Sequence, residues 1–294
     1  MAAPGVRRLV TAISLRWHYL ADHEAFRRSP VRILLRLFRW RIRCLLRRPA
    51  TIRLRRWDVR LWLPAVWDGS AIALFTYRDE YEPELRAMER LLRPGDCFVD
   101  AGANYGIYTV VAARLVGSSG RVLAFEPAAE QFAILRTNIE LNGLENVVPF
   151  QLALSERAGQ ASLYRHGDDS GLFSLGKGES FTGVSELVET RTLDDVLREG
   201  RDCRVSVVKL DVEGAEELIL RGCSRMLNRD RPSIILEVFP DAARRLGLEG
   251  FGAWRLLRGE GYRFYGVGRR PRLQAPAWNA VAIHPATDRR SRGN

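Results

Sequence analysis

The sequence lacks any long apolar run that is free of charge. No stretch of about eighteen uncharged apolar residues occurs among its 294 positions, so no membrane-spanning helix is expected. Arg16 and His18 interrupt the apolar start of the chain, and no small-residue cleavage site follows, which argues against a secretory signal. The four cysteines include no CxxC pair, so the spacing predicts neither a zinc site nor a disulfide framework. A reducing cytoplasm is therefore the expected location.

Lysine is nearly absent, and the basic charge is confined to one end of the chain. Lys177 and Lys209 are the two lysines of the sequence. Residues 1–60 hold sixteen arginines and three acids, a net charge of +13, whereas the remaining 234 residues carry 30 basic and 32 acidic side chains. A body without basic excess argues against a nucleic-acid-binding protein, and no nucleic-acid partner is expected.

Apolar strand-like runs alternate with helical patterns from residue 97 onward, which is typical of a parallel sheet covered by helices. We predict an α/β fold with a doubly wound, mostly parallel, Rossmann-like sheet and an N-terminal helical and β extension. The expected strands cover 97–102, 121–127, 147–154, 205–212, 233–239, 262–268 and 278–284. The expected segments are a basic amphipathic piece (1–49), a small β/helical lead-in (50–93), the main domain (94–288) and a disordered tail (289–294). Residues 155–191 break the alternation and are expected to form an irregular or β-hairpin insertion.

A glycine turn follows the first expected strand, in the stretch FVDAGANYGIYTVVAA. The strand ends in Asp100, the turn contains Gly102 and Gly106, and Glu126 ends the next strand. Such turns leave backbone groups free at the ligand edge of a sheet, and an acid at the second strand end suits both hydroxyls of a ribose. Asn104 occupies the place where a dinucleotide site has its second glycine, so a nucleoside without a pyrophosphate fits better. The alternative is a plain tight turn with a solvated acid.

A second group of acids gathers at the end of the fourth strand, in VVKLDVEGAEELILRG. Asp211 and Glu213 lie where that strand of a doubly wound sheet meets its ligand crevice, and Glu237 near the fifth strand end is expected at the same rim. Lys209 and Asp211 share one face of the strand, which predicts an ion pair that lowers the pKa of Asp211.

The stretches DAGANYGIYT, AFEPAAEQFAILRTNIELNG, ALSE and VVKLDVEGAEELILRG together resemble the FkbM family of methyltransferases, over about residues 50 to 284. The resemblance implies a class I methyltransferase fold, S-adenosylmethionine (S-adenosyl-L-methionine) as the methyl donor and, usually, methylation of oxygen. It also implies that Asp100, Gly102, Asn104 and Glu126 contact the donor and, with less settled roles, that two further acids belong to the active site: Asp211 and Glu213.

Transfer of a methyl group to an alcohol requires a group that accepts the hydroxyl proton, and a carboxylate within reach contributes about 10²–10⁴-fold. Asp211, Glu213 and Glu237 are the candidate catalytic residues. His166 is a fourth candidate, although a solvated loop histidine is the more frequent situation. Because no His/Cys cluster has ligand spacing, we expect no metal, while noting that Mg²⁺ accepts oxygen ligands such as these acids.

A helical pattern over 31–48 carries one apolar and one basic stripe. The apolar positions are Val31, Leu34, Leu35, Phe38, Ile42, Leu45 and Leu46, and the arginines are Arg32, Arg36, Arg39, Arg43 and Arg47. This pattern is typical of an interfacial membrane helix, which would place the protein peripherally at the inner membrane surface. The alternative is a helix whose apolar face docks on the body or on a second subunit.

The leading hypothesis is an S-adenosylmethionine-dependent methyltransferase acting on a hydroxyl of a sugar, glycan or secondary metabolite. One alternative is an NAD(P)-dependent oxidoreductase, which Asn104 and the missing third glycine disfavour. Another is a non-catalytic membrane or nucleic-acid binding module, which the basic N-terminus suggests. The sequence decides neither the acceptor nor the oligomeric state.

Overall fold

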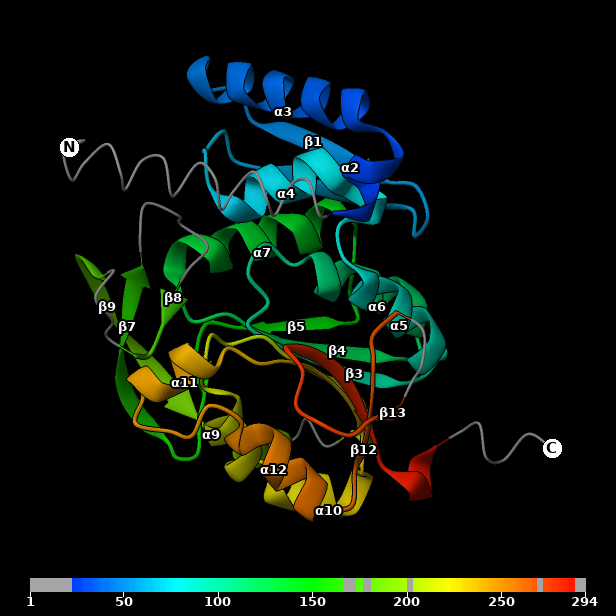
Figure 1. Ribbon diagram of the computed structural model, residues 1–294, viewed down its shortest axis with the longest axis vertical. Coiled ribbons are helices and arrows are strands. Elements are labelled where there is room, and N and C mark those ends of the chain that lie inside the picture. The colour runs from blue at the N-terminus through cyan, green and yellow to red at the C-terminus, as the bar shows by residue number, and fades with distance from the viewer. Residues whose placement is uncertain (1–22, 167–172, 177–180, 200–202, 269–271, 289–294) are drawn as a thin grey trace.

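The computed structural model describes residues 23–166, 173–176, 181–199, 203–268 and 272–288. The tail expected over 289–294 lies outside these ranges. The central feature is an eight-stranded sheet with the order β13-β12-β14-β11-β10-β3-β4-β5 (Figure 1). Its strands are β3 (Cys97–Ala101), β4 (Arg121–Phe125), β5 (Val147–Phe150), β10 (Val205–Leu210), β11 (Ser233–Glu237), β12 (Arg263–Tyr265), β13 (Arg272–Leu273) and β14 (Asn279–Ile283).

The five strands from β5 to β11 pair in parallel, whereas β14, β12 and β13 add antiparallel strands at one edge. The chain winds outward from β3 in both directions, first to β4 and β5 and then to β10 and β11. This confirms the predicted doubly wound, mostly parallel, Rossmann-like sheet, which has the strand arrangement of a class I methyltransferase. Each expected strand has a counterpart, except that the run expected over 147–154 divides into β5 and a separate two-residue strand over 153–154 in another sheet, and β13 is an addition.

Helices cover both faces of the sheet because both faces of its strands are apolar. Phe98 and Val99 of β3 are both fully buried, and they belong to two different core clusters, one on each side. The first face packs against α5 (Pro83–Leu91), α6 (Ile107–Val116) and α7 (Ala129–Leu141). The second face packs against α8 (Leu193–Arg198), α9 (Glu216–Arg221), α10 (Ser224–Asp230) and α12 (Gly252–Gly259). Two short elements, α11 (Pro240–Arg245) and η2 (Pro285–Thr287), complete this half.

The expected insertion forms a small separate sheet beside the carboxyl ends of the central strands (Figure 1). Its strands are β6 (Ala153–Leu154), β7 (Gly159–His166), β8 (Phe173–Ser174) and β9 (Phe181–Arg191). β7 and β9 pair antiparallel as a long hairpin, which agrees with the β-hairpin alternative of the prediction and not with irregular structure. This hairpin brings side chains from residues 155–191 to the ligand edge of the main sheet.

The lead-in packs on the helical layer of the first face. It consists of the hairpin β1 (Ala50–Leu54) and β2 (Val59–Leu63), followed by α4 (Gly69–Tyr77) and η1 (Arg78–Glu80). Asn138 of α7 accepts a 2.6 Å hydrogen bond from the Trp62 N–H, and Asn142 accepts one of 2.8 Å from the Arg60 N–H. These side chains satisfy the backbone of β2 and fix the lead-in to the main domain.

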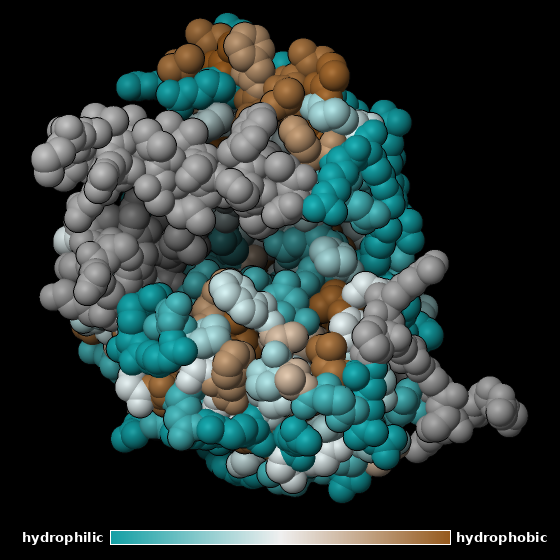
Figure 2. Space-filling view, viewed as in Figure 1, coloured by the Kyte–Doolittle hydropathy of each residue, from teal (hydrophilic) through white to brown (hydrophobic). Residues whose placement is uncertain are grey.

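The amphipathic helix over 31–48 is present as α3 (Pro30–Leu45), preceded by α2 (Glu24–Arg28). It packs on the body through Ile33 and Trp40, which are fully buried, and Trp40 stacks on Phe75 of α4. The predicted apolar stripe faces solvent instead: Leu35 is 58% exposed and Phe38 63% exposed. Figure 2 shows this stripe as a band of hydrophobic side chains over α3. The helix therefore docks on the body through another face, so the alternative that its apolar stripe docks on the body is wrong, whereas docking of the stripe on a second subunit stays an alternative.

Candidate active site

A cavity of about 550 Å³ opens at the carboxyl ends of β3, β4, β10 and β11. Gly102, Asn104 and Glu126 line one part of it, and all three candidate catalytic acids line another. The two strand ends that the sequence singles out are therefore brought into one site. Asp100 and Gly106 are not among the residues that line the cavity.

The turn after β3 approaches the end of β10 so closely that only glycine fits. Gly102 has φ +80°, and a Cβ placed on it would lie 1.9 Å from the carbonyl oxygen of Asp211. The Asp211 N–H in turn donates a 3.2 Å hydrogen bond to the Ala101 carbonyl oxygen. The backbone thus holds the candidate donor turn against the candidate catalytic strand end.

Asn104 joins the turn to Glu126. Its backbone adopts φ +48°, and its N–H donates a 2.8 Å hydrogen bond to Glu126 Oε2. The side-chain amide donates to Ser70 Oγ at 3.2 Å, while Asn104 Oδ1 is buried and accepts no hydrogen bond from the described residues. The backbone N–H of Asn104 is therefore bonded to a protein carboxylate, whereas its Oδ1 could still accept a hydrogen bond from a ligand.

Glu126 is 6% exposed and lies on the wall of the cavity. Its second oxygen, Oε1, accepts a 2.9 Å hydrogen bond from the Ala128 N–H. Burial raises the pKa of Glu126 to about 7, although the hydrogen bonds from Ala128 and Asn104 act in the opposite direction. The carboxyl group is thus fixed by two backbone donors, and each oxygen retains a lone pair for a ligand hydroxyl.

Asp100 and Gly106 belong to the turn region but do not line the cavity. Asp100 is fully buried, Thr109 of α6 donates a 2.6 Å hydrogen bond to its Oδ2, and burial raises its pKa. Gly106 begins α6 with φ +86°, and a Cβ there would lie 2.6 Å from Leu135 Cδ1. In this structure both residues shape the turn, and a direct contact of Asp100 with the donor stays a prediction.

At the other part of the cavity, Lys209 and Asp211 form the predicted ion pair, with 2.8 Å between Nζ and Oδ2. Lys209 is buried beneath the ring of Tyr108, whose centroid lies 4.2 Å from Nζ. Burial alone would lower the pKa of Lys209, but the surrounding carboxylates, first Asp211 and then Asp100, raise it above its usual value. Lys209 therefore remains a buried cation within a group of acids.

Glu213 and Glu237 complete the acidic wall. Burial, followed by the nearby charge of Asp211, raises the pKa of Glu213 to about 8 and that of Glu237 to about 9. Lys209 partly offsets the shift of Glu237. Both groups are consequently protonated to a large extent at neutral pH, unlike an acid in water.

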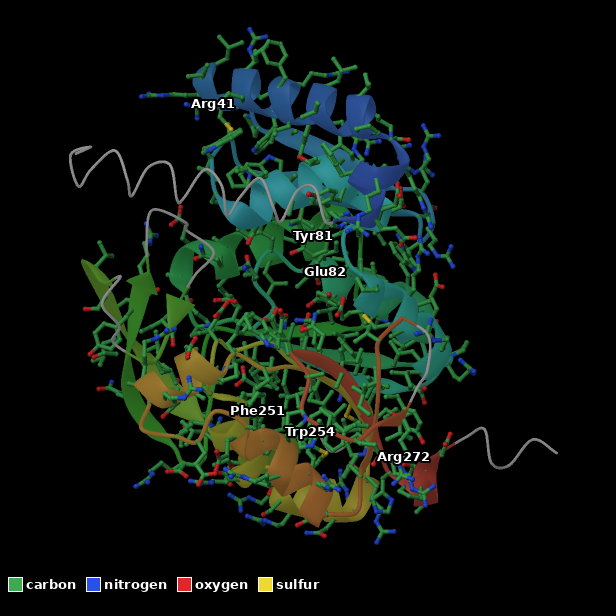
Figure 3. All side chains as sticks on the ribbon, in the orientation of Figure 1. Arg41, Tyr81, Glu82, Phe251, Trp254 and Arg272 are labelled. Atoms are coloured by element: carbon green, nitrogen blue, oxygen red, sulfur yellow. A yellow bond between two sulfur atoms is a disulfide. The ribbon has the colours of Figure 1, made fainter. Side chains whose placement is uncertain are left out.

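The lead-in contributes a further acid to the site, which the sequence did not predict. Glu82, the residue before α5, lines the cavity, and the Tyr108 hydroxyl donates a hydrogen bond to it. Figure 3 shows Glu82 and its neighbour Tyr81 between the α3–α4 layer and the central sheet. Burial raises the pKa of Glu82 to about 7, and the neighbouring Glu84 adds to the shift. No local motif marks Glu82, since it reaches the site only through the packing of α5.

The insertion and Phe239, two residues after β11, also reach the cavity. Leu163, Ser174 and Leu175 line it from β7 and β8, and Phe239 lines it from the end of β11. Ser174 Oγ donates a 2.9 Å hydrogen bond to the Glu213 carbonyl oxygen, which ties the insertion to the acidic wall. The side chain of His166, the fourth candidate base, lies outside the described residues.

A family model described as a methyltransferase FkbM domain matches residues 100–264, which contain both halves of this site. The chain belongs to the FkbM methyltransferase family.

Three relatives show the range of proteins that this FkbM-family chain resembles. "Methyltransferase 1" of Beauveria bassiana is 31% identical over 44% of this chain and 59% of its own length. The "31-O-demethyl-FK506 methyltransferase FkbM" of Streptomyces tacrolimicus is 29% identical over 75% of this chain and 91% of its own. The "Hexuronic acid methyltransferase AglP" of Haloferax volcanii is 28% identical over 45% of this chain and 52% of its own. The chain thus spans just over half the length of two of these relatives.

The FkbM-family site is built from acids, yet within the described ranges no three His, Cys, Asp or Glu side chains are arranged to hold a metal ion. Lys209 occupies the centre of the acids, where it supplies positive charge. Metal independence remains a prediction.

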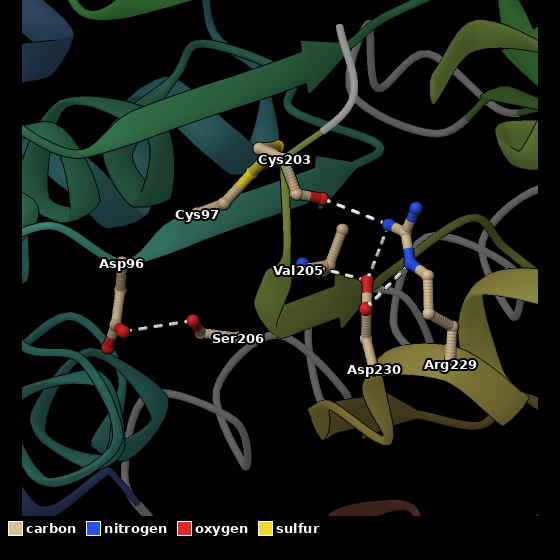
Figure 4. The surroundings of a disulfide bond; sticks show 7 residues. All are labelled: Asp96, Cys97, Cys203, Val205, Ser206, Arg229 and Asp230. Carbon is tan, nitrogen blue, oxygen red and sulfur yellow. Dashed lines mark hydrogen bonds and ion pairs between the residues drawn. A yellow bond between two sulfur atoms is a disulfide. The ribbon is translucent and has the colours of Figure 1, made fainter. Parts of the chain in front are cut away.

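One feature of the FkbM-family chain corrects the sequence analysis. Cys97, at the start of β3, forms a disulfide with Cys203, just before β10, with 6.4 Å between their Cα atoms (Figure 4). The pair is 106 residues apart in sequence, and the parallel pairing of β3 with β10 brings the two together. The expectation of no disulfide is therefore wrong, because local spacing does not reveal a strand-to-strand neighbour. The bond lies at the opposite end of β3 from the cavity.

Proposed function

We propose that the protein transfers a methyl group from S-adenosylmethionine to a hydroxyl of a sugar, glycan or secondary metabolite, with Asp211 as the general base. One observation supports this most strongly. A single cavity joins the Gly102–Asn104–Glu126 wall to the acidic wall of Asp211 and its neighbours. The donor and the base would then face each other across one volume.

The residues of the first wall fit the donor. A volume of about 550 Å³ falls within the range of small-molecule sites. Glu126 offers two carboxyl oxygens to a ribose diol, and Asn104 Oδ1 is a buried acceptor that no described residue uses. When bound, S-adenosylmethionine supplies a methyl group already activated by a positively charged sulfur.

The same geometry disfavours the oxidoreductase alternative. In a dinucleotide site, the turn amides approach the pyrophosphate. Here the Asn104 N–H donates a hydrogen bond to the Glu126 carboxylate, and the Gly102 N–H donates one to the Phe125 carbonyl oxygen. Two amides of the turn are thus already used within the protein.

Asp211 is the best base among the three acids. Its carboxylate lies 2.8 Å from the Lys209 ammonium, 31% of its side chain is exposed, and it lines the cavity. Glu213 and Glu237 have raised pKa values and hold protons near neutrality. We propose that these two bind the acceptor by hydrogen bonds while Asp211 accepts the hydroxyl proton.

The acceptor is proposed to be a neutral, hydroxyl-rich molecule. Carboxyl groups at Glu82, Asp211, Glu213 and Glu237 all line the cavity, and carboxyl oxygens accept hydrogen bonds from hydroxyls. Methylation of oxygen is consistent with the relative named for 31-O-demethyl-FK506.

Methyl-labelled S-adenosylmethionine tests the proposal. We expect the purified protein, incubated with glycan and metabolite fractions, to yield a product heavier by one labelled methyl group in place of hydrogen. Asp211→Asn should abolish most of this product while leaving donor binding in place. No labelled product in any fraction, together with no donor binding, would support the non-catalytic alternative.

A further inference from the structure

Helix α3 presents an apolar surface that nothing in the described structure covers. Of the large apolar side chains that are exposed in the described residues, seven lie on α3 and the residue after it: Val31, Leu34, Leu35, Phe38, Ile42, Leu45 and Leu46. Three others, Val184, Leu187 and Trp278, are spread over the rest of the protein. A contiguous exposed apolar surface of this kind marks an interaction site.

This surface is separate from the face by which α3 is attached. Ile33 and Trp40 are fully buried against the body, and Cys44 donates a hydrogen bond through Sγ to the Val66 carbonyl oxygen. The helix is therefore held in place without using its apolar stripe. An apolar stripe left outward on a firmly docked helix is available to a partner.

Arginines border the stripe. Arg32, Arg39 and Arg43 follow it at helical spacing on one flank, and Arg41 lies on the other, with its guanidinium 4.8 Å from the centroid of the Trp67 ring. Figure 3 shows Arg41 reaching outward from the end of α3. Among the described residues, one carboxylate, that of Glu80, forms an ion pair with an α3 arginine, Arg32. Most of this positive charge is thus free to meet an anionic surface.

We propose that α3 binds the protein peripherally to an anionic lipid membrane, with its apolar stripe inserted among the acyl chains and its arginines at the phosphates. An apolar face and a basic border are the two signals that together hold a helix in a membrane interface. None of the helices in the described ranges has the length and apolar character needed to cross a bilayer, so the contact is interfacial.

The other occupants fit less well. A symmetric pairing of two copies through this stripe would bring the same arginine borders together, and like charges across an interface oppose association. Nucleic acid would be attracted by the arginines, but its charged phosphate backbone would not bury the seven exposed apolar side chains. An anionic membrane satisfies both features of the surface.

The position of α3 relates this surface to the cavity. α4 packs beneath α3 through the stacking of Phe75 on Trp40, and Gly69, Ser70 and Ala73 of α4 line the cavity. A membrane bound at α3 would therefore lie one helix away from the proposed active site. The inference itself does not depend on methyl transfer and is tested by binding alone.

The test is co-sedimentation of the full chain with vesicles of phosphatidylcholine, with or without phosphatidylglycerol. We expect the protein to pellet with the anionic vesicles and to be partly released by salt. The double variant Leu35→Ser/Phe38→Ser should lower the partition coefficient by at least about tenfold, because two exposed apolar anchors are lost. Its thermal unfolding should match that of the wild type, since both positions are exposed.

The matched control is Val184→Ser/Leu187→Ser, which removes two comparably exposed apolar side chains, 52% and 67%, from β9. This control should pellet as the wild type does. For charge, Arg39→Gln/Arg41→Gln on α3 should weaken binding to anionic vesicles, whereas Arg136→Gln/Arg255→Gln on α7 and α12 should not.

Several results would overturn the proposal. One is a folded wild type that ignores anionic vesicles at low salt, and another is Leu35→Ser/Phe38→Ser protein that pellets normally. A wild-type dimer that this double variant converts to a monomer, without vesicle binding, would assign the surface to a second copy. Retention on duplex DNA that survives the double variant, again without vesicle binding, would assign it to nucleic acid.

Discussion

The Lys209 ammonium lies 2.8 Å from the Asp211 carboxylate, at the point where β10 reaches the cavity. All but 3% of the Lys209 side chain is buried, whereas 31% of the Asp211 side chain is exposed. Lys209 is therefore buried in the protein, whereas the Asp211 carboxylate faces the cavity. This arrangement places a buried positive charge beside an acid that lines the cavity.

Replacing Lys209 by Met should destabilise the protein by about 3 kcal/mol, because it leaves buried acids without their cation. Urea unfolding measures the change. The pair of Arg136 with Glu140, whose side chains are 59% and 69% exposed, provides a control, since Arg136→Gln should cost less than about 1 kcal/mol. The double variant Lys209→Met/Asp211→Asn should recover part of the loss. A Lys209→Met protein as stable as the wild type would contradict the claim that Lys209 stabilises the buried acids.

Glu126→Gln should weaken binding of S-adenosylmethionine by about 1–3 kcal/mol, because the amide presents one acceptor oxygen where the carboxylate presents two. Equilibrium dialysis with labelled donor measures the affinity. Glu130→Gln on α7, an exposed position with 58% of its side chain accessible, is the control and should leave binding unchanged. Equal affinities of the wild type and a folded Glu126→Gln protein would remove Glu126 from the donor site.

The acidic site should make stability fall as pH rises. In the folded protein the pKa values of Glu82, Glu126, Glu213 and Glu237 are raised from 4.5 to about 7, 7, 8 and 9. Between these values and 4.5 the folded state holds protons that the unfolded chain has released, so ionisation favours unfolding. Urea unfolding from about pH 5 to about pH 8 should show this decline.

The decline should be smaller in Glu213→Gln, which cannot ionise at the site, and this variant should be more stable than the wild type at the upper end of the range. A surface substitution, Glu130→Gln, should leave the pH profile unchanged. Stability that stays level or increases over the same interval would contradict the raised pKa values.

Gly102→Ala should separate the two halves of the site. Its Cβ would lie 1.9 Å from the Asp211 carbonyl oxygen, so the turn or the β10 end must move. Gly183 has a similar φ, +85°, but open space around it, and Gly183→Ala should cost only the backbone strain of about 1–2 kcal/mol. Thermal unfolding should show a larger loss for Gly102→Ala, by about a further 1–3 kcal/mol, and loss of donor binding as well. Similar losses in both variants would mean that the turn accommodates the methyl group.

The sequence predicts the sheet well because its strands are apolar runs bounded by turn and loop residues. It places the strands to within a few residues, as for β3, expected over 97–102, and β4, expected over 121–127.

Features that depend on packing between distant segments could not be predicted. Periodicity reveals the apolar stripe of α3 but not that Ile33 and Trp40, which lie outside it, face the body. Glu82 and the disulfide of Cys97 with Cys203 likewise follow from tertiary neighbours. Asp100 lies one residue before the end of β3, and its side chain accepts a hydrogen bond from Thr109 instead of lining the cavity.

Calorimetric titration of S-adenosylhomocysteine into the full chain tests the central claim most directly, because it examines the donor site without requiring the acceptor. The account predicts saturable binding of one ligand per chain. It also predicts that binding weakens in Glu126→Gln and persists in Asp211→Asn, because Asp211 belongs to the acidic wall. Absence of binding to the folded wild-type protein would contradict the assignment of this cavity to a methyl donor.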